Sequence, residues 1–541
     1  LKGASALYYG FTSPSGVVNM VTKRAMGEPN LSFQTTMDQY GEAIGSVDAG
    51  ARFGKNKQFG VRFNAAGGSL GSFGIDGVDG RRSFESVAAD WDATSRLHLS
   101  LDYEHALQSV NEQAIIQVPT AVNGVITLPR LPAYSNYLSA GPWAVTRGNI
   151  ANTIAKAVYN ISDNWTAEID MGSAITNRTE RALGIFTLTN PATGDGKLSM
   201  SMDQGERFVN DNYRAEITGL IPIGSIANEV IFGVERNDRY QNTARGESLN
   251  SYMQNLYDPM QFAQLFPFKR PAIADKPQNA RDDGIYVLDR VHFNDQWQVL
   301  LGARHTDYND VNQPTPTTET IYQASKITPS AAVIYQFRDD SSVYASYIQG
   351  LQEGSTAPSV GVVNPGEVFG PQVSTQKEIG FKTEALKGVT ATVAYFDMKV
   401  PTPGYLVPSS SPTLSLFVQS GMSHYRGFEL TVAGQLSPEL SIVAGGMLMH
   451  ASQLSAPNLS QVGKIPDSTP EHTLNGYLSY KPAWAPRFGF SVGTFYVGKR
   501  PLGPLEQGWL PGYTTDTVSA SYVVQLPARH KLTFRLSVDN V

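Results

Sequence analysis

The chain has 541 residues, 17% of them charged, and a formal net charge of -6 at pH 7. This weakly acidic balance argues against a nucleic-acid partner. The absence of cysteine excludes disulfides, thiolate metal sites and cysteine nucleophiles. No apolar run approaches the roughly 18 residues of a membrane helix. The mean hydropathy of -0.22 still allows a membrane barrel, because inward polar and outward apolar side chains cancel in the average.

The first 25 residues form a dense series of turn and strand signals. These are Gly3, a Tyr-Tyr-Gly step at 8–10, a Ser-Pro-Ser-Gly turn at 13–16, a β-branched strand at 17–21 and the basic pair Lys23-Arg24. The series resembles the end of the plug domain in TonB-dependent outer-membrane receptors, although Lys2 replaces the usual Arg and Ser15 the first of two glycines. The resemblance implies that residues 1–27 are the C-terminal end of a plug domain, and that the chain is part of a longer protein.

After residue 27 the sequence alternates between apolar and polar side chains. The period of two is clear at 96–104, 213–218, 428–432 and 532–539. We count about 21 such segments, mostly about 10–15 residues long, whereas strands of soluble proteins average about 5–6. We therefore expect one set of side chains to point outward, away from a polar interior: Leu97, Leu99, Leu101, Leu532, Phe534 and Leu536.

The connections between these segments alternate in length. Short polar turns occur at 54–57, 92–94, 162–164, 294–296, 338–341 and 436–439, and long connections at 110–148, 179–205, 241–280, 351–373 and 451–470. Outer-membrane barrels show this asymmetry, with tight periplasmic turns and long extracellular loops. The sequence therefore predicts an all-β fold, with a transmembrane antiparallel β-barrel over residues 28–541 and the plug end in its lumen.

An odd strand number has its own consequence. Bacterial barrels close with an even number of strands, 22 in the plugged transporters. About 21 strands therefore indicate a 22-strand barrel whose final strand is missing from this chain. We expect the gap between the strands near residues 31–38 and 532–541.

Other short motifs of the same receptors follow in family order. They are similar to the sequences at 297–304, 343–350, 378–382, 395–397, 426–429, 513–514 and 536–540. Together with the plug-like segment they identify the chain as a member of the TonB-dependent receptors. Its length favours the ferric-siderophore branch over the longer carbohydrate receptors. The resemblance implies the outer membrane of a Gram-negative bacterium.

The spacing of the histidines and charged residues does not indicate a catalytic or metal site. The eight histidines show no metal-ligand spacing, so we expect solvated residues rather than a metal site. We expect several charged residues to face the lumen as plug-facing ion pairs rather than as ligand contacts: Arg304, Glu378, Lys382, Arg426 and Glu429. Outer-membrane barrel hydrolases have far fewer strands than we count in this chain, so we do not expect an enzyme.

Aromatic residues concentrate in two of the long connections. If a chelate binds there, the candidate ligand-binding residues are Tyr134, Tyr137, Trp143, Tyr252, Tyr257, Phe266 and Arg270. Aromatic faces bury the apolar shell of an iron chelate, and a cation attracts the chelate if it is anionic. The alternative is that these aromatic side chains pack loop against loop.

The resemblance implies active transport. A ferric siderophore would bind at the loops, and the TonB protein with its inner-membrane energising complex would drive import through a barrel surrounded by outer-membrane lipid and lipopolysaccharide. No cofactor is expected, because iron enters only as its chelate. One alternative is uptake of another nutrient, such as a corrinoid or a different metal chelate. The other is a passive porin or adhesion barrel, although an open pore has no use for a plug.

Overall fold

The computed structural model describes residues 7, 10–11, 14–72, 74–139, 141–243, 247–261, 276–315, 318–358, 361–411, 413–527 and 530–540. Two candidate ligand-binding residues, Phe266 and Arg270, lie outside this described part of the chain. Within it, no helix has the length and apolar character needed to cross a membrane.

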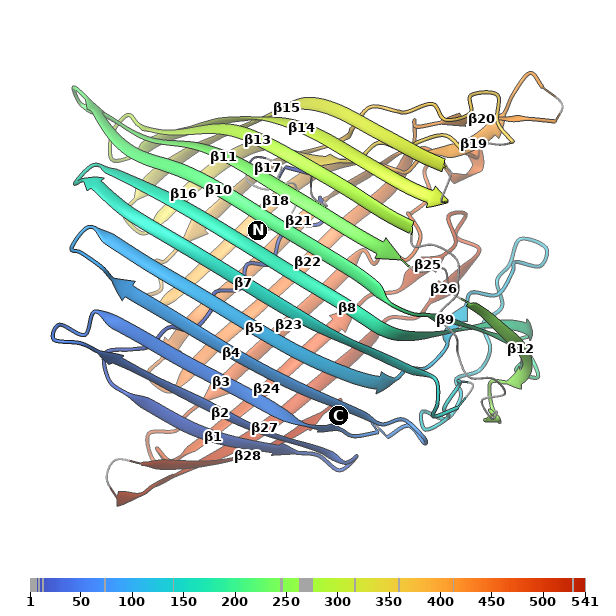
Figure 1. The fold of residues 1–541 in the computed structure, drawn as a ribbon, viewed down its shortest axis with the longest axis horizontal. Helices are drawn as coiled ribbons and strands as arrows, with labels where there is room; N and C mark the ends of the chain where they lie inside the picture. The colour runs from blue at the N-terminus through green and yellow to red at the C-terminus, as the bar shows by residue number, and fades with distance from the viewer. Residues whose placement is uncertain are drawn as a thin grey trace.

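One large sheet forms the wall of the molecule and curls around a lumen (Figure 1). The wall strands in chain order are β1 (Asn30–Met37), β2 (Glu42–Phe53), β3 (Phe59–Leu70), β4 (Gly80–Asp92), β5 (Leu97–Asn111), β7 (Val145–Ser162), β8 (Trp165–Asn190), β10 (Glu206–Ile223), β11 (Ile226–Thr243), β13 (Lys276–His292), β14 (Trp297–Thr315), β15 (Thr318–Arg338), β16 (Ser341–Gln352), β17 (Gln372–Thr383), β18 (Val389–Pro401), β21 (Met422–Ser437), β22 (Leu440–Ser455), β23 (His472–Tyr480), β24 (Phe488–Val497), β27 (Tyr513–Gln525) and β28 (Lys531–Asp539).

The remaining elements lie in the long connections. The sheet also includes β6 (Ile115–Gln117), β9 (Asp195–Asp203) and β12 (Glu247–Asn255). Two small hairpins are β19 (Tyr405–Pro408) with β20 (Ser415–Val418), and β25 (Arg500–Leu502) with β26 (Gly508–Leu510). A 3-10 helix spans Leu459–Gln461.

Each wall strand pairs antiparallel with the wall strands before and after it. The sheet has 24 strands in the described residues, and β6, β9 and β12 are not wall strands, so the wall has 21, as predicted. Among the described residues β1 pairs only with β2, and β28 only with β27. The open seam therefore lies between the two predicted segments.

Alternation along each wall strand separates a lumenal face from an outward face. On β5, Asp102 contacts Arg24 of the segment that precedes the wall, so Leu101 next to it faces outward. The strand registers carry this assignment around the wall to β28, where Leu536 is 71% exposed. The predicted outward set is confirmed: Leu97, Leu99, Leu101, Leu532, Phe534 and Leu536.

Outward aromatic side chains collect at the end of the wall that carries the short turns. Phe59 stacks between Phe53 and Trp91, with ring centroids 5.7 Å and 5.6 Å away. Trp297 stacks on Tyr335 at 4.5 Å. Rings at this level form a girdle where a barrel wall meets the membrane surface. The short-turn end thus has the character of a periplasmic rim, and the long connections lie at the opposite end.

Candidate functional site

A hydrophobic cluster, here called the loop-end cluster, packs the long connections against each other. Its buried members are Ala114, Leu138, Ala144, Ala182, Phe186, Leu188, Leu198, Met200, Met202 and Leu256. Three predicted ligand-binding residues, Trp143, Tyr252 and Tyr257, are half-buried and pack against it. The structure therefore brings these three side chains together through loop packing.

The other two candidates in the described residues have opposite environments. Tyr137 is 3% exposed, and burial raises the pKa of its hydroxyl. Tyr134 is 73% exposed. The guanidinium carbon of Arg130 lies 4.1 Å from the centre of the Tyr257 ring, a cation–π contact that covers one face of that ring. Of the five described candidates, only Tyr134 presents most of its surface to solvent.

Phe11, from the segment before the wall, sits in a lumenal pocket formed by β13, β14 and β15. Its ring stacks on Tyr308 with centroids 4.2 Å apart, and its backbone N–H donates to Asp282 Oδ2 at 3.0 Å. The Tyr308 hydroxyl donates to Glu353 at 3.0 Å and accepts from Arg239 at 3.1 Å. We call this arrangement the Phe11 seat. It ties the N-terminal segment to the wall by ring stacking and by a charged hydrogen bond.

The wall beneath the Phe11 seat is organised by Arg304, which is 1% exposed. Arg304 donates to Glu235 at 2.8 Å, to Asp282 at 3.4 Å and to the Thr306 hydroxyl at 3.0 Å. A Cβ on Gly10 would lie 2.6 Å from the Asp282 carboxylate, and Gly10 has a φ of +57°. The close approach of the chain to this ion pair therefore requires glycine.

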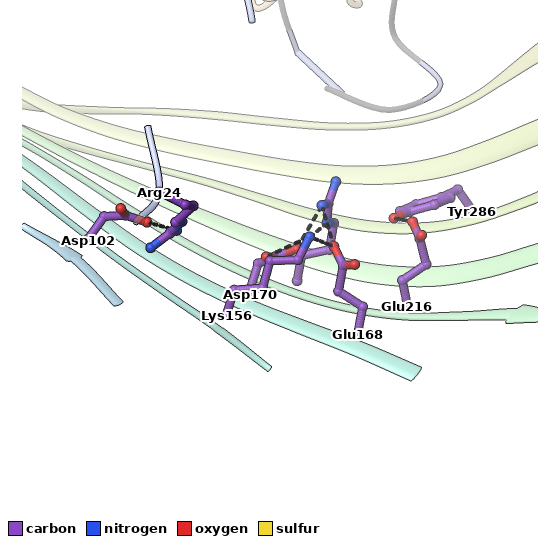
Figure 2. Close-up of polar contacts among 8 residues, drawn as sticks. Arg24, Asp102, Lys156, Glu168, Asp170, Glu216 and Tyr286 are labelled. Carbon is purple, nitrogen blue, oxygen red and sulfur yellow. Dashed lines mark hydrogen bonds and ion pairs between the residues drawn. The ribbon is translucent and has the colours of Figure 1, made fainter. Parts of the chain in front are cut away.

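Charged side chains also cover the lumenal face of β7, β8 and β10, and we call this set the charge belt (Figure 2). Lys156 lies 2.5 Å from Glu168 and 3.7 Å from Asp170. Arg214 lies 2.7 Å from Asp170 and 3.4 Å from Glu168. Figure 2 shows the labelled belt residues on the same side of the sheet as Arg24. Two cations face these two carboxylates, and Glu216 of β10, which accepts a hydrogen bond from the Tyr286 hydroxyl at 2.8 Å, adds a third carboxylate on the same face.

A second attachment of the N-terminal segment lies near the short-turn end. Arg24 Nη2 lies 2.5 Å from Asp102 Oδ2, and the Arg24 carbonyl accepts a hydrogen bond from Arg62 at 2.9 Å. Arg62 also binds both oxygens of Asp48, at 2.8 Å and 2.6 Å. The bidentate ion pair with Asp48 fixes the position of Arg62, which in turn binds the Arg24 carbonyl. The segment is therefore attached to the wall at two places, at the Phe11 seat and at Arg24.

The registers place four of the predicted lumenal charges on that face: Arg304, Glu378, Lys382 and Glu429. Among the described residues Arg304 pairs with Glu235 and Asp282 of the wall, so ion pairs of these charges with the plug stay a prediction. The predicted lumenal position is wrong for Arg426. Arg426 lies opposite Asp397 in the register. Its side chain is on the outward face together with Phe428, which is 56% exposed, whereas Glu429 is on the lumenal face. Because side chains alternate with a period of two, residues 426 and 429 cannot share a face of one regular strand.

Two adjoining lumenal cavities of about 570 Å³ and 290 Å³ meet at Thr176 near the long-loop ends of the strands. We call them together the lumenal pocket. Side chains that define it include Arg82, Phe84, Ile150, Arg178, Phe208 and Arg239. Rings and guanidinium groups thus both line a space that opens to the lumen.

The arginines of the lumenal pocket differ in their pairing. Arg178 lies 3.3 Å from Glu206 and stands over the Phe208 ring at 5.1 Å. Arg82 makes no ion pair with another described residue, and it is exposed. The aromatic content of the loops directed the sequence analysis away from these wall residues. The sequence could have pointed to them, because the period-two alternation places them on the lumenal face at the strand ends next to long connections.

No group of three or more histidine or carboxylate side chains in the described ranges could hold a metal ion.

Residues 53–541 match the protein family described as TonB dependent receptor-like, beta-barrel. The ferrichrome receptor FcuA of Yersinia enterocolitica is 28% identical, over 80% of this chain and 57% of FcuA. The metal-pseudopaline receptor CntO of Pseudomonas aeruginosa is 22% identical, over 100% of this chain and 75% of CntO. The chain thus spans a little over half of one curated relative and three quarters of another.

Solved structures share the fold. BauA, the ferric preacinetobactin receptor from Acinetobacter baumannii, has a TM-score of 0.87 at 24% identity, over 100% of this chain and 80% of BauA. The closed form of the ferric-catecholate import receptor Fiu from Escherichia coli has a TM-score of 0.85 at 18% identity, over 100% of this chain and 81% of Fiu. By its family match and its wall of antiparallel strands, the chain belongs to the TonB-dependent receptors of the Gram-negative outer membrane.

Proposed function

We propose that the protein is an active transporter, not an enzyme, that binds a ferric siderophore and imports it with energy delivered by TonB. The family match carries this proposal. Relatives named as receptors for ferrichrome and for catecholate siderophores support the ligand class. Iron is the cargo, and the chelator supplies its coordination sphere.

The lumenal pocket is our proposed binding surface on the barrel wall. Arg82 offers a cation that has no ion pair among the described residues, and Phe84 and Phe208 offer rings that line the same two adjoining cavities. This combination suits a chelate with an apolar shell and negative charge. Tyr134 is the loop residue that could reach such a ligand with most of its surface free. Trp143, Tyr137, Tyr252 and Tyr257 would then position the loops, and Phe266 and Arg270 remain candidates from the sequence.

We further propose that residues 1–27 are the end of the plug domain and that residues 28–541 form the barrel without its final strand. The Phe11 seat and the Arg24–Asp102 ion pair support the first part, because both attach this segment to the lumenal face. Edge strands β1 and β28 support the second, since an unpaired strand edge in lipid is costly. Lipid and lipopolysaccharide would contact the outward face.

A different metal chelate is the second candidate cargo, because the metal-pseudopaline receptor aligns over the whole of this chain. Ligand titration separates the two. We expect a ferric hydroxamate or ferric catecholate to quench the tryptophan fluorescence of the full-length receptor in detergent. Tight binding of a corrinoid or a non-ferric metal chelate, with no response to any ferric siderophore, would overturn the siderophore proposal.

Transport itself needs a separate test. Iron uptake from the chelate that binds should stop in cells that lack TonB, while binding to the cell surface remains. Equal uptake with and without TonB would instead indicate a passive pore.

A further inference from the structure

Three cations lie on the outward face of the wall on neighbouring strands. Lys377 of β17 lies opposite Asp397 of β18, and Arg426 of β21 lies opposite the same aspartate. Lys399 lies opposite His424, one pair nearer the long-loop end. The outward side chains of these strands also include Ile379, which is 60% exposed, and Phe428, which is 56% exposed. The cations therefore share a face with the apolar residues that would contact lipid.

Within the described residues, these cations have no carboxylate partner of their own. Asp397 is bound by His424 at 2.9 Å, and none of Lys377, Lys399 and Arg426 forms an ion pair with another residue in the described ranges. With one carboxylate for three cations, the patch carries excess positive charge in a chain whose net charge is -6.

The outward charges on β11 and β13 are arranged differently. Arg236 lies 2.6 Å from Asp283, and Arg281 lies 2.8 Å from Asp238. Those cations are neutralised by carboxylates on the adjacent strand. Arg81 and Arg207 also lie on the outward face without an ion pair among the described residues. The β17–β21 patch differs because it gathers three such cations around one carboxylate.

The depth of the patch fits the outer membrane surface. Lys399 is 10 residues along β18 from Val389, and Arg426 is 11 residues from Ser437 on β21. At about 3.3 Å per residue and a tilt of about 40°, this distance corresponds to a height of about 25 Å, the height of the apolar band of such barrels. Lys377 lies lower, six residues from Thr383, and its long side chain can extend toward the headgroups.

A groove of about 890 Å³ runs along the outward wall beneath these cations. Its lining includes Leu301, Val333, Ile379 and Tyr395 below, and Lys377, Lys399 and the paired Asp397 and His424 above. An apolar groove capped by cations complements a molecule with an acyl chain and an anionic head.

We propose that this groove is a specific site for a phosphorylated lipid of the outer leaflet. Its phosphate would lie between Lys377, Lys399 and Arg426, and one acyl chain would lie along Leu301, Val333 and Ile379. Charge complementarity selects the phosphate, and the depth of the patch selects a lipid over a soluble anion. The site lies on the opposite face of the wall from the lumenal pocket, so it does not depend on the cargo proposed above.

The test compares binding of diphosphoryl lipid A and phosphatidylcholine to the purified full-length receptor in a neutral detergent, by native mass spectrometry without any chelate. We expect diphosphoryl lipid A to bind preferentially. The double variant Lys377→Gln/Lys399→Gln should lower its affinity by roughly 25-fold, at about fivefold per cation. The variant Lys377→Arg/Lys399→Arg should retain binding, and millimolar inorganic phosphate should not displace the lipid.

Lys382→Gln is the matched control, since it removes the same charge from the lumenal face of the same strand. It should leave lipid binding unchanged. Heat-modifiable mobility on a gel reports whether each variant is folded. Equal binding of the two lipids, wild-type affinity in the double glutamine variant, or an equal loss in Lys382→Gln would each overturn the site. Displacement by inorganic phosphate would show a simple anion site instead.

Discussion

The loop-end cluster and the lumenal pocket lie at the same end of the wall and are both rich in aromatic residues, but they use them differently. In the cluster, Phe186 is fully buried. In the pocket, Phe84 is half-buried beside the exposed Arg82. A long connection must bury apolar surface of its own to offset the entropy lost on ordering it. The largest side chains of a long connection are therefore used for packing. Wall strands are already ordered by backbone hydrogen bonds to their neighbours, so their side chains can stay accessible to a ligand.

The largest difference should appear between two phenylalanine substitutions. Phe186→Ala should destabilise the loop-end cluster by about 3–5 kcal/mol, because it removes a fully buried ring and leaves a cavity. Hydrogen exchange in β9 and β12 should accelerate accordingly. Phe84→Ala, the matched control in the lumenal pocket, should leave this exchange unchanged and weaken chelate binding. The comparison fails if Phe84→Ala loosens β9 and β12 as much as Phe186→Ala does.

The buried Arg304 and the exposed Arg82 allow a similar comparison for charged side chains. Arg304→Ala leaves Glu235 and Asp282 buried without their cation, which should cost about 3–5 kcal/mol of stability. Thermal unfolding followed by the loss of heat-modifiable mobility would measure this. Arg82→Ala should change the stability by less than about 0.5 kcal/mol, because it removes an exposed side chain. A similar loss in both variants would mean that Arg82 has a structural partner.

For ligand binding, Arg82 should matter more than it does for stability. Arg82→Gln should weaken an anionic chelate by about 1–2 kcal/mol, and the effect should shrink as salt increases, because screening reduces the attraction. Trp143→Ala is the comparison from the loop-end cluster. If Trp143 contacts the ligand, as the sequence analysis predicts, its loss should also cost about 1–2 kcal/mol, but without dependence on salt. Fluorescence titration at two ionic strengths measures both.

The smallest effect concerns the Phe11 seat. Phe11→Ala removes the ring that stacks on Tyr308, so the seated state should lose about 0.5–1.5 kcal/mol. Faster exchange of the residue 11 amide, which donates to Asp282, would report it. Tyr308→Phe keeps the ring and removes the hydroxyl, so it should have less effect. If Tyr308→Phe releases the segment as fully as Phe11→Ala does, hydrogen bonding rather than stacking holds the seat.

The comparison also separates local from long-range information. Period-two alternation placed Leu101 and Leu536 outward, because neighbouring side chains of a strand point to opposite faces whatever the strand pairs with. The same rule, applied along β21, would have placed Arg426 outward with Phe428. The prediction that Arg426 and Glu429 both face the lumen did not apply this local pattern, and the pattern was right.

The sequence by itself determined the strands, the alternation of short turns and long connections, and the plug-like segment, because each is written in a few adjacent residues. Only the tertiary structure decided that Tyr137 is buried while Tyr134 is exposed. It also decided that Arg304 is paired, whereas Arg82 and Lys399 have no ion pair in the part of the chain that the structure describes. Those outcomes depend on which residues the lateral register and the folded loops bring within a few ångströms, across separations that no local pattern encodes.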